Sequence, residues 1–175
     1  MSCLQSETQT YKNIFVTVGT TKFDRLISLV DSFEFQELIT TRLQCKRLVV
    51  QRGQGSIAPT CKVTGLELST FRLKPDIAEE FEAADLVICH AGAGSIMDAA
   101  KAGKTTIAVI NSALMDNHQT ELARSMADQR YLVSVASPEE LIHVIEQGSL
   151  ALRDLQVFPG INSTLFAERV RSYFA

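Results

Sequence analysis

The sequence has few features of a membrane, secreted or nucleic-acid-binding protein. No apolar run approaches the roughly 20 residues that a membrane-spanning helix needs, and the polar start MSCLQSETQTYKN lacks the apolar segment of a signal peptide. Four cysteines are scattered without a C-x-x-C pair, which favours reduced cytosolic thiols over disulfides or zinc. The net charge of −3 gives no sign of the basic face that nucleic acid requires. The sequence therefore predicts a soluble cytoplasmic chain that does not bind nucleic acid.

Repeats, low-complexity runs and linkers are also missing, which favours a single domain. The 175 residues, of which 46% are hydrophobic and 21% charged, are enough for one well-packed core. We expect a loose N-terminal tail at residues 1–12 and one domain at residues 13–175. Strand-length apolar runs alternate with helical patterns, which is typical of a mainly parallel sheet covered by helices on both faces. The predicted fold class is α/β, of the Rossmann-like type.

The expected elements follow from apolar periodicity and from local start and stop signals. Strands are expected at residues 14–18, 46–51, 86–89, 105–110 and 131–135, with one bent or two short strands within 63–73. Helices are expected at residues 22–43 with a break at 31–32, and at 76–84, 96–102, 118–128, from 138 onward and 161–174. Capping boxes are expected at Thr21 with Asp24 and at Ser137 with Glu140. Pro75 and Pro138 suit first helical turns, and Gly103 a helix stop.

The chain is organised around a segment in which a buried strand, a glycine-rich turn and a helix follow one another. The strand Leu86–Cys89 leads into the turn His90–Ser95, which opens the helix. Free N–H groups at a helix start bind anions, and glycine lets a phosphate approach them closely. The segment therefore predicts a nucleotide-phosphate site.

Other polar turns are expected at the same edge of the sheet, because ligands of parallel sheets lie beyond the carboxyl ends of the strands. These turns are Gly19-Thr20-Thr21, Arg52–Ser56, His90–Ser95 and the loop Asn111–Gln119.

Each of these signals also has a purely structural explanation. A lone G-x-G can serve only a tight turn, and Asp98 can cap its helix together with Ser95, as can Gln119 with Asp116. A dinucleotide site is disfavoured, because Met97 replaces the third glycine of its fingerprint and no acidic residue ends the next strand. An oxidoreductase or epimerase is therefore the weakest functional hypothesis.

Taken together, these residues resemble a known family. The run HAGAGSIMDAAKAGKTTIAVINSALMDNHQTELA resembles the donor-binding segment of the glycosyltransferases that include the bacterial peptidoglycan lipid-linked N-acetylglucosaminyltransferase. The runs IFVTVGTTKFDRLI and SALMDNHQTELA are similar, more narrowly, to soluble catalytic subunits of eukaryotic UDP-N-acetylglucosamine transferases of dolichol-linked oligosaccharide synthesis. The resemblance extends from Ile14 to about Phe174, with two departures: Asp98 stands where Glu is common, and Thr105-Thr106 replaces a proline-containing turn.

The resemblance implies the donor-binding, C-terminal half of a GT-B glycosyltransferase fold. It implies UDP-GlcNAc as the donor substrate, with no cofactor, and the lack of a D-x-D pair argues against a metal. The implied substrate-binding residues are Gly19, Thr20, Thr21, Leu73, Lys74, Gly92, Ala93, Gly94, Ser95, Asp98, Asn117, His118 and Gln119, with His90 as the catalytic candidate. In these roles the glycine turns hold the diphosphate, and Asp98 accepts hydrogen bonds from the ribose. The backbone near Leu73 and Lys74 contacts the uracil, and His118 and Gln119 contact the GlcNAc hydroxyls.

The implied reaction is an inverting transfer of GlcNAc, with a β1,4 linkage, to GlcNAc-diphosphate-dolichol, the second step of N-glycan precursor assembly. A membrane-anchored second subunit would supply the acceptor-binding half and would recruit this chain to the cytosolic face of the endoplasmic reticulum. The catalytic base would be His90 or a residue of that subunit. The alternative is a stand-alone nucleotide-sugar-binding module without transferase activity. The terminal helix at residues 161–174 would either dock the partner or pack on its own sheet.

Overall fold

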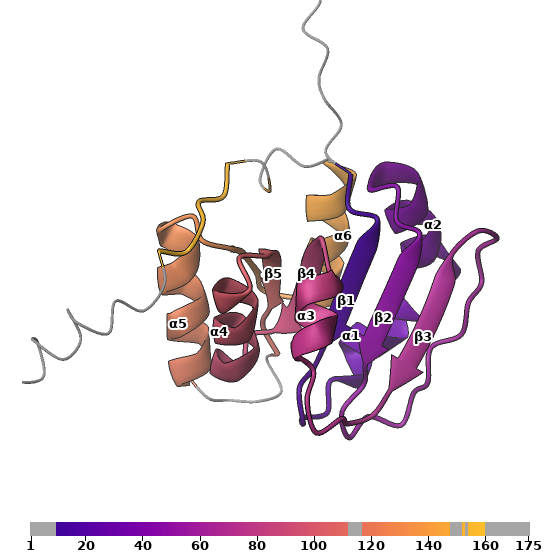
Figure 1. Ribbon diagram of the computed structural model, residues 1–175, viewed down its shortest axis with the longest axis horizontal. Coiled ribbons are helices and arrows are strands. Elements are labelled where there is room, and N and C mark those ends of the chain that lie inside the picture. Colours follow the sequence, from indigo (N-terminus) through magenta and orange to yellow (C-terminus); the bar gives the residue numbers. More distant parts are fainter. Residues whose placement is uncertain (1–9, 112–116, 148–151, 153, 160–175) are drawn as a thin grey trace, which may run out of the picture.

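The computed structural model describes residues 10–111, 117–147, 152 and 154–159 (Figure 1). Strands and helices alternate along this part of the chain, except that the strands at residues 47–51 and 67–71 follow one another without a helix between them. The strands are β1 (Asn13–Thr17), β2 (Arg47–Gln51), β3 (Glu67–Phe71), β4 (Leu86–His90), β5 (Thr105–Val109) and β6 (Val133–Val135). The helices are α1 (Asp24–Val30), α2 (Phe33–Arg42), α3 (Ala78–Ala83), α4 (Ala93–Lys101), α5 (Asn117–Asp128) and α6 (Pro138–Glu146).

The strands form one parallel sheet in the order β3-β2-β1-β4-β5-β6. Strand order reverses at β1, which pairs with β2 on one side and with β4 on the other. Such a reversal opens a crevice at the carboxyl ends of the two central strands. The α/β, Rossmann-like prediction is therefore confirmed, and the crevice lies between the ends of β1 and β4.

Helices cover the two faces of the sheet in separate layers (Figure 1). Helices α1, α2 and α6 pack on one face, where Ile14, Val16 and Leu48 belong to the larger buried cluster. Helices α3, α4 and α5 pack on the other face, against the cluster that contains Phe15 and Val87. Alternate residues of β1 thus enter opposite cores, as the two-residue period of a strand requires. This double burial explains why the central strands are continuous apolar runs.

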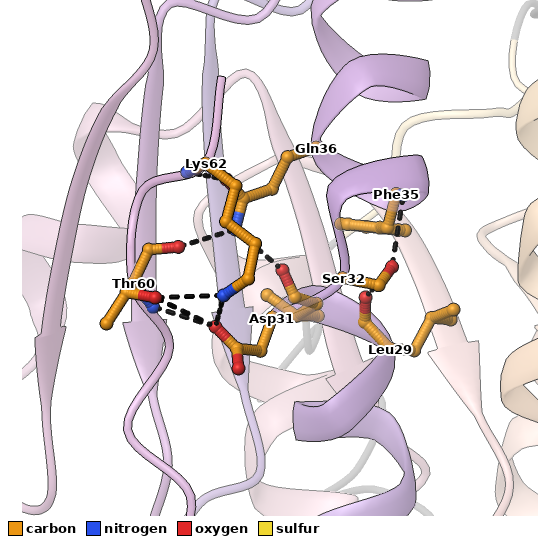
Figure 2. A network of polar contacts seen from close by, with 8 residues as sticks. Leu29, Asp31, Ser32, Phe35, Gln36, Thr60 and Lys62 are labelled. Carbon is orange, nitrogen blue, oxygen red and sulfur yellow. Dashed lines mark hydrogen bonds and ion pairs between the residues drawn. The ribbon is translucent and has the colours of Figure 1, made fainter. Parts of the chain in front are cut away.

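A polar clamp fixes the long connection between β2 and β3 against the break between α1 and α2 (Figure 2). Buried Gln36 donates to the Thr60 carbonyl (2.9 Å) and accepts from the Lys62 amide (2.8 Å). Asp31 accepts from the Thr60 amide (2.9 Å) and from Lys62 Nζ (2.6 Å). Burial alone would raise the pKa of Asp31, but hydrogen bonds from Lys62 and Thr60 outweigh it and lower that pKa. The break at Asp31 and Ser32, predicted from the sequence, is therefore an attachment point for the next loop.

Two predicted helix starts are wrong. Helix α1 begins at Asp24 behind Phe23, without a side-chain cap, because the Thr21 hydroxyl donates instead to the Val18 carbonyl (2.8 Å). Pro75 lies before α3, whose first amide, that of Ala78, bonds to the Asp76 carboxylate (2.9 Å).

Other start and stop signals are confirmed. Ser137 caps α6, with Pro138 in the first turn. Gly103, with φ of +65°, follows the end of α4. The segment expected to hold one bent or two short strands contains the single strand β3.

The expected N-terminal tail ends earlier than predicted. Tyr11 is buried, and its amide bonds to the Leu43 carbonyl (2.8 Å), so the packed domain already includes this residue. The cysteines within the described part of the chain, Cys45, Cys61 and Cys89, are unpaired. Among the described residues no helix is long and apolar enough to cross a membrane. The helix expected at residues 161–174 lies outside the described residues.

Candidate functional site

The site lies at the carboxyl edge of the sheet, where the turns after β1, β2 and β4 meet. The Gln54 amide donates to the Thr21 carbonyl (3.0 Å), which joins the turn after β2 to the turn after β1. The turns after β1 and β4 pack closely, because a Cβ atom added to Gly19 would approach the ring of His90. Asn111, beyond β5, donates to the Lys22 carbonyl (3.3 Å). The structure therefore brings together the polar turns that the sequence placed on one edge.

The ring of His90 fills the space beneath two glycines. A Cβ atom added to Gly92 would lie 2.1 Å from His90 Nε2, and one added to Gly19 would lie 3.0 Å from His90 Cε1. The same added atom at Gly19 would lie 3.7 Å from the Ser95 hydroxyl oxygen. Gly19 also has a φ of +58°, a conformation that side chains rarely adopt. Both glycines are therefore needed for the close contact of backbone and histidine.

His90 is neutral in this environment. Its side chain is 6% exposed, and burial lowers its pKa, against a smaller opposing effect of the Thr17 backbone. No acceptor or donor with hydrogen-bond geometry reaches Nδ1 from the described residues. A neutral imidazole can exchange hydrogen bonds with a ligand at the crevice, but it adds no positive charge near neutral pH.

This burial predicts a specific acid sensitivity. An unfolded chain protonates His90 below the ordinary pKa of 6.5, whereas the folded chain resists protonation until the pH reaches its lowered pKa. In that window the unfolded state binds more protons, so stability falls with decreasing pH by up to about 1.4 kcal/mol per pH unit. Urea unfolding at pH 8, 6 and 5 should show a weaker pH dependence in His90→Gln than in the wild type.

The start of α4 presents open backbone N–H groups. Gly92 is the N-cap and no side chain caps the helix, so the structural alternative in which Asp98 caps it together with Ser95 does not hold. The Gly92 amide bonds back to the His90 carbonyl (2.7 Å), whereas those of Ala93, Gly94 and Ser95 meet no acceptor among the described residues. Unpaired amides and the helix dipole together favour an anion.

The turn after β1 contributes less than expected. The Gly19 amide donates to Thr17 Oγ1 (2.9 Å) and the Thr21 amide to the Val18 carbonyl (3.2 Å). The Gly19 and Thr21 amides are thus satisfied within the turn, and of its three residues Thr20 is the one whose amide meets no acceptor in the described part of the chain. Gly19 is required instead because of its positive φ and its close contact with His90.

Thr17 and Gln51 are site residues that the sequence interpretation missed. Their side chains are buried at the ends of β1 and β2, where the Thr17 hydroxyl donates to Gln51 Oε1 (2.6 Å). Because Thr17 in turn accepts the Gly19 amide, this pair fixes the turn. The available signal was a polar residue at the last position of each of two apolar strands.

Asp98 lies beside a groove between α3 and α4. The groove encloses about 340 Å³ and is lined by Asp76, Ile77, Ala78, Phe81, Glu82, Asp98, Lys101 and Ala102. Asp98 is exposed, and it stands one turn beyond the open amides of α4. Asp98, which lines the groove, therefore lies about one helical turn from the open amides, near enough for one ligand longer than a phosphate to reach both.

Leu73 and Lys74 precede α3 and do not line this groove. Leu73 is 52% exposed, while Lys74 pairs with Glu80 and lies over the ring of Phe71, 4.4 Å from its centre. Asn117 begins α5, but the side chains of Asn117, His118 and Gln119 lie outside what the structure describes, as does Asp116.

Comparison with known proteins points to one family. Residues 13–156 match the glycosyltransferase family 28 C-terminal domain. The human UDP-N-acetylglucosamine transferase subunit ALG13 is 42% identical over 122 residues, which make up 69% of this chain and 11% of the human protein. The mouse relative of the same name is 35% identical over 152 residues, 82% of this chain and 13% of its own length. The chain thus spans a small part of these two relatives.

Solved structures agree in fold. The solution NMR structure of ALG13 has 28% sequence identity and a TM-score of 0.63, and the alignment covers 91% of this chain and 95% of that one. The crystal structure of MurG from Acinetobacter baumannii has 22% identity and a TM-score of 0.55, over 87% of this chain and 47% of that one. The latter match confirms that the fold is one half of a GT-B architecture.

Proposed function

Because this chain belongs to glycosyltransferase family 28, as its C-terminal domain, we propose that it is the donor-binding catalytic subunit of a heteromeric N-acetylglucosaminyltransferase. It transfers GlcNAc from UDP-GlcNAc to GlcNAc-diphosphate-dolichol, in the second step of N-glycan precursor assembly. The observation that carries this proposal is the set of open amides at Ala93, Gly94 and Ser95, beside the crevice between β1 and β4.

The donor occupies this edge from the groove to the helix start. Its diphosphate accepts hydrogen bonds from the open amides of α4 and from Thr20, in the position that the helix dipole favours. Asp98 accepts from the ribose hydroxyls at the mouth of the groove, and the backbone at Leu73 and Lys74 pairs with the uracil. Asn117, His118 and Gln119 bind the GlcNAc hydroxyls.

The reaction inverts the anomeric centre. The acceptor hydroxyl attacks the anomeric carbon and forms the β1,4 bond, the bond from that carbon to the diphosphate oxygen breaks, and UDP leaves with the electron pair. A base takes the hydroxyl proton. This chain stabilises the leaving group with amides and a helix dipole, without a metal. Buried His90 lies beneath the diphosphate site, away from an incoming acceptor, so we place the base on the partner.

The partner is a membrane-anchored subunit that holds the acceptor, and it recruits this chain to the cytosolic face of the endoplasmic reticulum. The human and mouse relatives are named as subunits, which supports a heteromeric enzyme. The decisive experiment measures UDP release from UDP-GlcNAc and a lipid-linked GlcNAc acceptor, with and without the co-expressed partner. Donor binding without transfer in any combination would instead identify a nucleotide-sugar-binding module.

Asp98 offers a test of the donor pose. Since Asp98 does not cap α4, Asp98→Asn should leave the melting temperature nearly unchanged. Loss of the charged acceptor should cost about 1.5–3 kcal/mol and raise the KM for UDP-GlcNAc at least tenfold. The exposed Asp128 at the end of α5 gives the control variant Asp128→Asn, which should change neither quantity. An unchanged KM in Asp98→Asn would remove Asp98 from the site.

A further inference from the structure

Two arginines stand side by side at the carboxyl edge of β2 and β3. The parallel register pairs Gln51 with Phe71, and it continues by one residue because the Arg52 amide donates to the Phe71 carbonyl (3.0 Å). Arg52 and Arg72 therefore follow one another across neighbouring strands, which lie about 4.8 Å apart. Two permanent positive charges thus share one corner of the edge.

Both guanidinium groups are held on the same turn. Arg52 Nη1 donates to the Gly55 carbonyl (3.2 Å), and Arg72 Nε lies 3.5 Å from the Gly53 carbonyl oxygen. This anchoring orders the two groups while leaving most of their donors unused. Arg52 Nε is buried without a hydrogen-bond partner among the described residues.

No carboxylate of the described residues forms an ion pair with either arginine. Asp24 comes near the turn, since a Cβ atom added to Gly55 would lie 2.6 Å from Asp24 Oδ1, but Asp24 pairs with Lys22 (3.2 Å). Two guanidinium groups on neighbouring strands repel each other, and an anion bound to both reduces that repulsion. In a chain of net charge −3, the two guanidinium groups have no ion-pair partner among the described residues, and the nearby Asp24 Oδ1 is buried beside the turn without a hydrogen-bond partner there.

The arginine corner adjoins the donor site without being part of it. A Cβ atom added to Gly53 would lie 2.2 Å from the Thr21 carbonyl oxygen and 2.9 Å from that of Gly19, so the two turns are in direct contact. The open amides of α4 lie on the opposite side of the Gly19 turn, beyond His90. A diphosphate bound at α4 therefore leaves Arg52 and Arg72 available for a second anion.

We propose that Arg52 and Arg72 bind the diphosphate of the lipid-linked acceptor. The proposal rests on the proposed function, in which both substrates contain a diphosphate. Two such groups repel each other when they meet at one active site, so each needs its own source of positive potential. The start of α4 supplies the positive potential for the donor diphosphate. The two guanidinium groups supply it for the acceptor diphosphate, since a guanidinium group can bind two phosphate oxygens at once.

A binding experiment tests the corner independently of transfer activity. The isolated chain, saturated with UDP, is titrated with inorganic diphosphate while the Nε–Hε signals of its arginines are followed by NMR. We expect shifts at Arg52 and Arg72 but not at Arg25, whose guanidinium group pairs with Glu139 of α6 (2.9 Å). Shifts confined to the amides of residues 93–95, or no shifts, would overturn the proposal. Shifts of Arg52 and Arg72 on addition of UDP alone would assign the arginines to the donor site and would also overturn the proposal.

Steady-state kinetics of the complex with its partner test the role in catalysis. Exposed Arg72 allows a mild variant, and Arg72→Gln should raise the acceptor KM by about tenfold, which corresponds to about 1.4 kcal/mol, with an unchanged donor KM. Arg52→Gln should act in the same direction, Arg72→Lys should be intermediate, and Arg25→Gln should match the wild type. A rise in donor KM, or an unchanged acceptor KM in both Gln variants, would contradict the assignment.

Two ways of presenting the acceptor distinguish its diphosphate from lipid headgroups as the anion that the arginines bind. The acceptor is presented in neutral detergent micelles and in vesicles that contain an anionic phospholipid. An effect of Arg72→Gln in both supports the acceptor diphosphate, whereas an effect only on anionic vesicles would assign the arginines to lipid headgroups and overturn the proposal. If the wild-type complex transferred no sugar, the proposed function would fail, and the NMR titration would still decide whether the corner binds diphosphate.

Discussion

Replacing Gly94 with alanine is expected to keep the chain folded and slightly more stable while lowering its affinity for UDP roughly 10- to 100-fold. Nothing lies within 4 Å of a Cβ atom added to Gly94, so the free protein gains no clash. Alanine is favoured over glycine inside a helix by about 0.5–1 kcal/mol. The added methyl group occupies the space from which a phosphate reaches the open amides of α4, each of which is worth about 1.5–3 kcal/mol to a charged ligand.

The other end of the same helix supplies a reciprocal control. Gly103 has a φ of +65°, and alanine there should cost about 1–2 kcal/mol of stability with no effect on UDP affinity. Thermal unfolding and UDP titration of both variants distinguish a ligand-binding glycine from a conformational one. If Gly94→Ala bound UDP as tightly as the wild type, the helix start would not be the phosphate site.

Much of the fold could be predicted because its signals are local. The continuous apolar runs of β1, β4 and β5 follow from burial on both faces, and their alternation with helices fixes a parallel sheet. The rule that ligands lie at the carboxyl ends of parallel strands then brought His90, Gly19 and Gly92 together. The contact of His90 with both glycines agrees with that placement.

Helix starts were less predictable because one spacing serves several local structures. Ser137 and Glu140 form the expected cap of α6. The same spacing fails at Thr21, whose hydroxyl closes a turn on Val18, and at Ser95, which lies three residues inside α4. A serine or threonine can satisfy any nearby backbone group, so the spacing alone does not decide which group it meets.

Contacts between strands could not be predicted from one segment at a time. The bond from Thr17 to Gln51 and the pairing of Arg52 beside Arg72 both depend on strand register. Register is set by the packing of the whole sheet, since a shift by one residue would move every side chain to the other face. The hydrogen bond that fixes the Gly19 turn and the pairing of the two arginines were therefore visible only in the structure.

The second large effect concerns the partner: this chain alone is expected to bind UDP-GlcNAc but to transfer no sugar, and the complex is expected to be active. Ala93 and Gly94 are exposed at the helix start, and so is Asp98 at the groove. A donor bound there would face bulk water on the side away from the sheet. Transfer to a sugar hydroxyl in preference to water requires that this side be closed, and in the proposed complex the partner would supply both the closure and the base.

The experiment compares UDP release and lipid-linked product for the chain alone, the partner alone and the co-expressed pair. The variant Gly94→Ala, paired with the partner, serves as the control, because it should assemble normally and yet need a roughly 10- to 100-fold higher donor concentration for the same rate. This result would show that activity in the pair comes from the donor site of this chain and not from the partner. Product formation by the isolated chain at the rate of the pair would instead mean that the edge described above already contains a base and excludes water by itself.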